Sequence, residues 1–330
     1  MFSTLGAQLS YPDEQLNAII NDEYHYNAWF TPQNVEHAVK SIGKMLNKDD
    51  LTQWLDKYDI NYEKPAKQVG LILAGNIPLV GFHDVLCVLI TGNRALIKAS
   101  TQDARLIKYV LSMLLKIEPE FQSRYSFVER LENFDAVIAT GSNNTSRYFD
   151  FYFSKVPNII RKNRNSVAVL TGSETPGELY KLGHDIFDYF GLGCRNVSKI
   201  LVPDGYDFTP FFEAIQPHYT IINHHKYNNN YDYNKSIYLV NKDKHLDNGF
   251  LLVKQDERMV SPLAVVFYQQ YKDMATVEAF LQSESENIQC IVSTANFKSS
   301  NHVVGFGESQ QPALWDYADG VDTMDFLTKL

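Results

Sequence analysis

The stretch QVGLILAGNIPLVGFHDVLCVLITGNRALIKAS, residues 68–100, decides the fold class of this chain. It begins with a short apolar run that stops at a glycine, continues with a longer apolar segment, and ends with a second short aliphatic run. Short apolar runs bounded by glycine are typical of buried strands, and a longer segment between them is typical of a helix. The stretch therefore predicts a strand, a helix and a second strand parallel to the first.

The alternation of strand and helix continues along the chain. The further predicted elements are a helix at 101–117, a strand at 134–142, a helix at 143–155, a strand at 166–172, a helix at 175–191 and a strand at 198–203. Consecutive units of this kind form parallel sheets with right-handed crossovers. We therefore predict an α/β protein whose first sheet has a nucleotide-binding architecture.

A second series of alternating strands and helices begins near residue 165, which predicts a domain boundary there. The predicted parts are a helical lead-in at 1–62, a nucleotide-binding domain at 63–163, a second α/β domain carrying a candidate thiol at 164–300, and a C-terminal segment at 301–330 that packs back on the core. The segment 224–236, rich in asparagine and tyrosine, is predicted to be a polar loop or a short hairpin.

Composition excludes several classes of protein. The chain has 330 residues, of which 45% are hydrophobic and 21% charged, so it can bury more than one core. Its net charge of −9 disfavours nucleic-acid binding, because phosphate contacts require a basic surface. No segment reaches the roughly 18 apolar residues of a membrane span, and the N-terminus lacks a secretory pattern, so we expect a cytoplasmic protein.

The three cysteines stand in different surroundings. Cys87 and Cys290 lie inside apolar runs, where a cysteine behaves as a small hydrophobic residue. Cys194 instead follows two glycines and precedes Arg195, which suits either a reactive thiol or plain packing. No Cys-x-x-Cys pair is present, and the histidines at 224–225 lack carboxylate or cysteine partners at a ligand spacing, so no metal site is predicted.

Four short motifs occur in a defined order: AGNIP at 74–78, GNRALIKAS at 92–100, ATGS at 139–142 and GLGC at 191–194. In this order the sequence resembles the aldehyde dehydrogenase superfamily, and most closely its acyl-CoA reductase (LuxC-type) branch, over about residues 65–265. The resemblance implies an aldehyde-dehydrogenase-like fold, with a Rossmann-type cofactor domain and a second α/β catalytic domain.

The resemblance also assigns two catalytic residues. Cys194 matches the nucleophile that attacks the carbonyl carbon, with Gly191 before it and Lys199 after it as in the family, although Leu192 replaces the usual glutamine-like residue. Asn76 matches the amide that stabilises the tetrahedral oxyanion. Local sequence alone also fits Asn76 as a simple turn residue.

Cofactor residues are implied in the same way. Lys98 matches the lysine that reaches the adenosine ribose, and Thr101, three residues later, stands where many NAD-dependent members have a glutamate. Because no carboxylate at this position would repel a 2′-phosphate, the sequence favours NADPH as cofactor, with NADH as the alternative. Lys98 with the hydroxyl of Ser100 or Thr101 could bind a 2′-phosphate. The pyrophosphate would lie against Gly141 and Ser142 at a helix start. Near Pro262, counting places Arg258 at the position of the family glutamate that contacts the nicotinamide ribose, so Glu257, one residue away, is the candidate for that contact.

One departure bears on the direction of the reaction. Hydrolytic members have a glutamate that activates water where this chain has Arg161 or Lys162, with no carboxylate within three residues. A thioester on Cys194 would therefore persist until hydride or another thiol arrived. The basic residues Arg161, Lys162 and Arg164 suit either the phosphates of CoA or an exposed loop edge.

We therefore expect an enzyme that reduces an acyl thioester, acyl-CoA or acyl carrier protein, to an aldehyde with NADPH through a cysteine-bound acyl group. An acyltransferase or synthetase partner and a homo-oligomer are compatible with this expectation. The alternatives are an acyl-phosphate reductase, an aldehyde-oxidising enzyme, or a non-catalytic subunit that binds acyl carrier protein.

Overall fold

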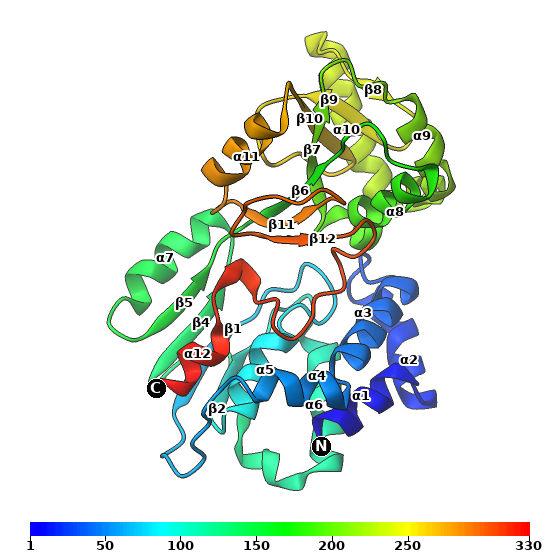
Figure 1. Cartoon of the computed structure of the whole chain (residues 1–330). Coiled ribbons are helices and arrows are strands. Elements are labelled where there is room, and N and C mark those ends of the chain that lie inside the picture. Colours follow the sequence, from blue (N-terminus) through cyan, green and yellow to red (C-terminus); the bar gives the residue numbers. More distant parts are fainter. The chain divides into compact units, whose positions relative to one another are not determined.

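The computed structural model describes residues 1–330, except for the side chain of residue 143, and divides the chain into two compact units (Figure 1). The first unit comprises Met1–Asn163 and Pro312–Leu330, and the second comprises Arg164–Gln311. Among the helices of the described chain, none is long and apolar enough to cross a membrane.

The first unit contains a five-stranded parallel sheet in the order β3-β2-β1-β4-β5. Its strands are β1 (Gln68–Ile72), β2 (Arg94–Lys98), β3 (Tyr125–Phe127), β4 (Ala136–Thr140) and β5 (Asn158–Arg161). Ile72 at the end of β1 pairs with Lys98 at the end of β2 and with Ala139 near the end of β4. The loops that follow these three strands therefore leave the same edge of the sheet.

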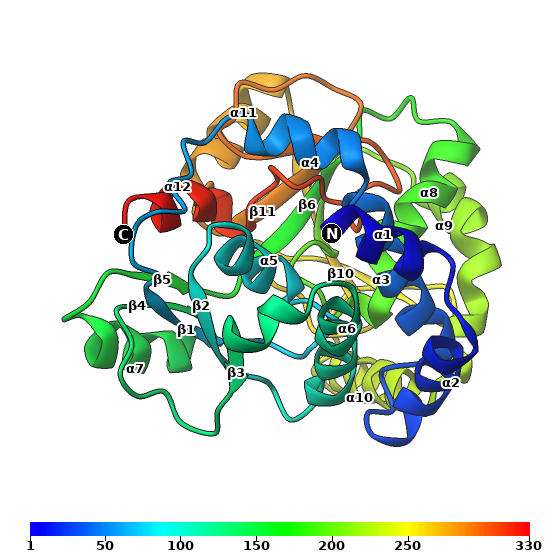
Figure 2. The same cartoon turned by 90° about the horizontal axis from the view of Figure 1, so that it is seen from below.

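Three helices connect these strands: α5 (Phe82–Ile90), α6 (Ala104–Ile117) and α7 (Asn143–Phe153). The chain moves from β1 to β2 and β3 in one direction but from β4 to β5 in the other. Because crossovers are right-handed, α5 and α6 cover one face of the sheet and α7 the opposite face (Figure 2). Cys87 lies inside α5 and is fully buried, as expected.

The N-terminal region contains four α-helices and packs beside α6 (Figure 2). Its helices are α1 (Phe2–Ser10), α2 (Glu14–Asp22), α3 (Pro32–Met45) and α4 (Lys48–Leu55). Side chains of Asp13, Thr31 and Asn47 cap three of them by accepting a hydrogen bond from a first-turn N–H. Apolar faces of these helices join the core that also contains α5 and α6.

Arg161, at the end of β5, attaches the C-terminal segment to this unit. Its side chain is 3% exposed, and it donates to a carboxylate oxygen of Asp84 at 2.6 Å, to the Ala318 carbonyl at 2.5 Å and to the Thr323 hydroxyl at 2.8 Å. Thr323 begins the last helix, α12 (Thr323–Thr328), which packs against α5. The suggestion that Arg161 attracts CoA phosphates is therefore wrong, because its guanidinium is buried and already paired.

The second unit contains a seven-stranded sheet in the order β12-β11-β6-β7-β10-β9-β8. Its strands are β6 (Asn165–Val169), β7 (Val197–Pro203), β8 (Leu246–Asp247), β9 (Leu252–Gln255), β10 (Val265–Tyr271), β11 (Ile288–Val292) and β12 (His302–Val304). The pair β8 and β9 is antiparallel, and the other neighbouring pairs are parallel.

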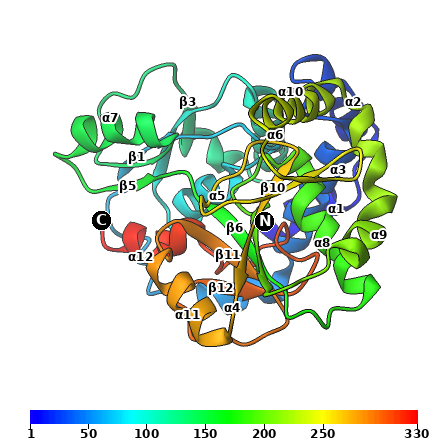
Figure 3. The same cartoon turned by 90° about the horizontal axis from the view of Figure 1, so that it is seen from above.

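Helices pack on both faces of this second sheet (Figure 3). They are α8 (Pro176–Phe187), α9 (Thr209–Ile215), α10 (His225–Asn241) and α11 (Met274–Ser283). Apolar residues of α8 and α9 form one core with alternate side chains of β7, whereas α11 forms a second core against the other face. Cys290 is fully buried in β11, as expected for a core cysteine.

The prediction of a loop or hairpin at 224–236 is wrong, because this segment lies within the helix α10. Tyr227, Tyr231, Asn234 and Tyr238 recur at helical spacing and are buried. Two of the tyrosine hydroxyls have acceptors: that of Tyr227 donates to the Phe250 carbonyl at 3.0 Å, and that of Tyr231 donates to the Asp247 carboxylate at 2.6 Å. The prediction failed because asparagine and tyrosine have low intrinsic helix propensity, whereas this helix is stabilised by tertiary packing.

We expect Arg161→Met to lower the free energy of unfolding of the first unit by about 3 kcal/mol, because the Asp84 carboxylate would lose its buried partner. The three tryptophans of the chain, Trp29, Trp54 and Trp315, all lie in this unit, so their fluorescence during urea unfolding measures the change. Lys162→Met, which alters an exposed neighbour, is the control and should change little. Equal stability of both variants would contradict the role of Arg161.

Candidate functional site

Cys194 lies on a tightly wound loop between α8 and β7. The loop begins with a tight turn at Asp188–Gly191, in which Tyr189 (φ 54°), Phe190 (φ 60°) and Gly191 (φ 76°) are consecutive left-handed residues. Left-handed backbone costs about 1–2 kcal/mol for each residue other than glycine. Such strain persists only where surrounding contacts impose it, and it is common at functional sites.

The side chain of Asn196 supplies those contacts from within the loop. Its amide nitrogen donates to the carbonyls of Asp185 at 3.1 Å and Asp188 at 2.9 Å, and its oxygen accepts from the N–H of Gly193 at 2.8 Å. Asn196 is 2% exposed, so these bonds lie away from water. One buried carboxamide thus ties the end of α8, the left-handed turn and the residue before Cys194 together.

Ser166, at the start of β6, fixes the main chain of Cys194 itself. Its hydroxyl lies 3.2 Å from the Cys194 carbonyl and 3.1 Å from the Cys290 sulfur, and it accepts from the Cys290 N–H at 3.3 Å. Ser166 is fully buried. The backbone that carries the thiol is therefore attached to the central strands of the sheet.

The three cysteines differ in accessibility. Cys87 and Cys290 are fully buried, whereas Cys194 is partly exposed. Burial raises the pKa of the Cys87 thiol well above its usual value and that of Cys290 to about 11. Burial disfavours the thiolate form of both thiols and shields them from a substrate, whereas Cys194 is accessible.

A cavity of about 30 Å³ lies beneath the thiol loop, and Gly191, Asn196, Ser198 and Leu263 are among the residues that line it. This volume holds a water molecule but not an acyl chain.

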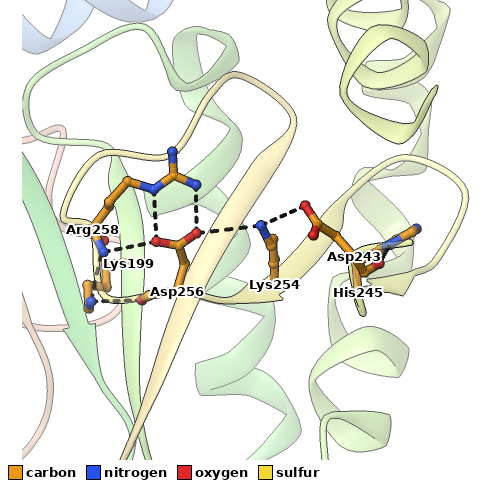
Figure 4. Close-up of polar contacts among 6 residues, drawn as sticks. All are labelled: Lys199, Asp243, His245, Lys254, Asp256 and Arg258. Atoms are coloured by element: carbon orange, nitrogen blue, oxygen red, sulfur yellow. Dashed lines mark hydrogen bonds and ion pairs between the residues drawn. The ribbon is translucent and has the colours of Figure 1, made fainter. Parts of the chain in front are cut away.

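Lys199 is only five residues after Cys194 in the sequence, but its ammonium group binds the turn at residues 256–258. Its ammonium donates to three main-chain carbonyls, those of Asp256 at 3.1 Å, Glu257 at 2.8 Å and Arg258 at 3.3 Å. Figure 4 shows Lys199 beside Asp256 and Arg258 of this turn. Burial lowers the pKa of Lys199 to about 8. Glu257 itself is exposed on this turn.

In the first unit, Asn76 lies in the loop after β1, beside the loop after β2. The contact is close at Gly75, where an added Cβ would lie 2.6 Å from the Cβ of Ser100. Only glycine fits there. Asn76 is exposed on this loop, as are Lys98 at the end of β2 and Thr101 beyond it. Among the ion pairs of the described residues, none involves Lys98.

Asp103 holds the loop of Asn76 in place. It is 4% exposed, and its carboxyl oxygen accepts from the N–H of Leu79 at 2.8 Å. Leu79 has a left-handed backbone (φ 58°), so this bond supports a strained turn three residues after Asn76. Burial raises the pKa of Asp103 well above its usual value, which favours the neutral carboxyl group.

Gly141 and Ser142 lie after β4, at the same sheet edge, where α7 begins. A Cβ on Gly141 would lie 2.9 Å from the ring of Phe149. The Ser142 hydroxyl accepts from the N–H of Thr145 at 3.3 Å and so caps the helix. A helix N-terminus after a glycine turn suits a phosphate group.

The candidate site residues fall into two groups, one in each unit of the chain. The first unit gathers Asn76, Lys98, Ser100, Thr101, Gly141 and Ser142 on loops that follow β1, β2 and β4. The second unit carries Cys194 and Glu257 on loops that are joined through β7. Sequence reasoning missed Asp103, Ser166 and Asn196, because single polar residues outside a motif carry no signal of burial.

We expect Asn196→Ala to loosen the thiol loop, because it leaves two buried carbonyls and the Gly193 N–H without partners, at a cost of about 1–3 kcal/mol each. Hydrogen exchange followed by mass spectrometry should show residues 186–194 exchanging at least tenfold faster. Asn287→Ala removes an exposed asparagine of the same unit and is the control. Unchanged protection of the loop would show that Asn196 does not hold it.

Comparisons with known proteins agree with this architecture. Solved structures that share the fold include an aldehyde dehydrogenase from Physcomitrella patens in complex with succinate, with a TM-score of 0.70 at 12% identity, covering 99% of this chain and 82% of that one. Another is an aldehyde dehydrogenase from Mycobacterium tuberculosis complexed with NAD+, with a TM-score of 0.62 at 11% identity, covering 92% and 76%. A third is lactaldehyde dehydrogenase from Escherichia coli, with a TM-score of 0.62 at 12% identity, covering 92% and 77%.

A search among curated protein sequences found no match. The sequence model of one family, described as acyl-CoA reductase (LuxC), matches residues 3–170, which is just over half of the chain. The matched region contains the whole sheet of the first unit and extends through β6. Since the fold is that of the aldehyde dehydrogenases, this match shows that the chain belongs to the acyl-CoA reductase (LuxC) family of oxidoreductases.

Proposed function

We propose that the protein reduces an acyl thioester, carried by CoA or by an acyl carrier protein, to an aldehyde, with Cys194 as nucleophile and NADPH as the preferred reductant over NADH. The observation that supports it is the strained loop that holds Cys194 partly exposed, while the two other thiols are buried. Family membership supplies the reaction class.

In this proposal the Cys194 sulfur attacks the thioester carbonyl carbon. The carbonyl electrons move to oxygen, and the resulting oxyanion accepts hydrogen bonds from the Asn76 amide and the Cys194 N–H. Such donors are worth a few kcal/mol in the transition state. The oxyanion then collapses, the bond to the CoA sulfur breaks, and the carrier leaves as a thiolate while the acyl group stays on Cys194.

The residues at the edge of the first sheet fit a dinucleotide. Side chains at Gly75 and Gly141 would collide with their neighbours, so the close packing of the loops after β1 and β4 requires glycine at both positions. Gly141 and Ser142 would bind the pyrophosphate and Lys98 the adenosine ribose, with Ser100 or Thr101 beside a 2′-phosphate. A bound reduced nicotinamide supplies the hydride that turns the thioester carbonyl into an aldehyde and frees the Cys194 thiolate.

The environment of Arg161 supports reduction over hydrolysis. Hydrolytic members have their water-activating glutamate at the position aligned with Arg161, and here that guanidinium is buried against Asp84 and the C-terminal segment. A thioester on Cys194 would therefore lack a general base for water at this position. The proposal also includes a cytoplasmic location and a homo-oligomeric state. It further includes a partner that delivers acyl groups, such as an acyltransferase or synthetase.

The thioester step predicts a covalent adduct. Mixing the protein with a panel of acyl-CoAs should add the acyl mass, as seen by intact-protein mass spectrometry. Cys194→Ala should abolish the adduct, whereas Cys87→Ala, which alters a buried thiol, should keep it. NADPH should then remove the adduct and release aldehyde. Absence of an adduct with acyl-CoA, acyl carrier protein and acyl phosphate alike would favour a non-catalytic binding subunit.

Cofactor preference tests the role of the loop after β2. Thr101→Glu places a carboxylate beside the proposed 2′-phosphate site, and like charges repel, so kcat/KM with NADPH should fall about tenfold or more, equivalent to ~1.4 kcal/mol. The value with NADH should change much less. Gln102→Glu adds the same charge one residue away on an exposed side chain and is the control. Equal losses with both nucleotides in Thr101→Glu would argue against this phosphate site.

A further inference from the structure

The turn at residues 256–258 rests on a buried cation. Lys199 is fully buried, and its ammonium donates to the carbonyls of all three turn residues while lying 5.2 Å from the ring centroid of Phe280. Among the ion pairs of the described residues, none includes Lys199, so its direct polar partners are the three main-chain carbonyls. Burying an ammonium in this way is costly.

The outer side of the same turn is held by a chain of charges. The Asp256 carboxylate accepts two hydrogen bonds from the Arg258 guanidinium, at 2.9 and 2.6 Å. Lys254 lies 3.6 Å from Asp256 and 3.0 Å from Asp243, so the ion pairs continue to the end of α10 (Figure 4). These groups are nearer to solvent than the fully buried Lys199, because Lys254 and Asp256 are partly exposed and Arg258 is exposed.

The convergence of three carbonyls on one ammonium determines which way the turn faces. With its main-chain oxygens directed inward, the turn carries Glu257 as an exposed side chain. A second tether comes from Ser198, whose hydroxyl donates to the Met259 carbonyl at 3.0 Å. Both tethers start from β7, the strand that follows Cys194, so the turn and the thiol loop share one support.

We propose that Lys199 is a positioning residue for cofactor binding: its ammonium fixes the 256–258 turn and thereby holds the Glu257 carboxylate in place for the nucleotide. This inference rests on the proposed function, in which Glu257 contacts the nicotinamide ribose. Lys199 itself touches neither cofactor nor thioester. A role as a proton donor or nucleophile does not fit, because its nitrogen is enclosed and its hydrogens are committed to the three carbonyls.

The test separates cofactor binding from chemistry at the thiol. Lys199→Met keeps the apolar stem and removes the ammonium. The Kd of the protein for NADPH, measured by fluorescence titration, should rise at least tenfold, while the rate of Cys194 acylation by acyl-CoA without NADPH stays within about twofold. Lys254→Met removes a cation from the outer side of the turn and is the matched control, with a change in Kd below threefold.

A double-mutant cycle tests whether the effect passes through Glu257. Glu257→Gln alone should weaken NADPH binding, and adding Lys199→Met should weaken it much less than Lys199→Met does in the wild-type background. Additive losses, or an unchanged Kd in Lys199→Met, would overturn the inference. Failure of the wild-type protein to form any acyl adduct would instead refute the proposed function, so the two failures are distinguishable.

The wild-type protein offers a test that needs no folded variant. A neutral amine has two hydrogens for three carbonyls, so the NADPH Kd should rise severalfold as the pH passes through about 8. The charged groups around the ammonium are Asp256 and Glu257 in the turn and Glu284 after α11. A Kd that stays constant between pH 7 and 9.5 would contradict the inference.

Discussion

The hydrogen bonds of the Asn196 carboxamide are the constraint on which the thiol loop depends. Two left-handed residues precede Gly191, and such a backbone is unfavourable unless its polar groups find partners. Asn196 satisfies carbonyls at the end of α8 and the N–H of Gly193 with one buried side chain. Without these hydrogen bonds the left-handed backbone would be unfavourable, and the loop would not hold Cys194 before β7, outside the apolar core.

Buried polar side chains have the same use elsewhere in the molecule. Lys199 gathers three carbonyls of the 256–258 turn, Asp103 supports the turn after Asn76, and Arg161 holds the C-terminal segment. In each case a group that is expensive to bury fixes main chain that regular secondary structure does not fix. The sheets set the positions of the loops, and these side chains set the conformations of the loops.

Hydrophobic patterning allowed the α/β class and most elements to be predicted. The run at residues 68–100 folds as β1, α5 and β2, and both core cysteines are buried. The segment that forms α10 was mispredicted because its helical contacts come from tyrosines buried against distant residues, which local propensity does not record. The role suggested for Arg161 was wrong for a similar reason: its partner Asp84 is 77 residues away in sequence.

The sequence by itself determined the fold class, the family and the motifs that carry Cys194, Asn76 and Lys98, because these depend on local periodicity and on the order of short segments along the chain. Only the tertiary structure decided which polar side chains are buried and what they bind. Asn196, Ser166 and Lys199 acquire their partners from other strands and turns, and a hydrogen bond between distant residues has no local signature. The hydrogen bonds that hold the loops of the candidate site therefore cannot be read from the sequence, whereas its motifs can.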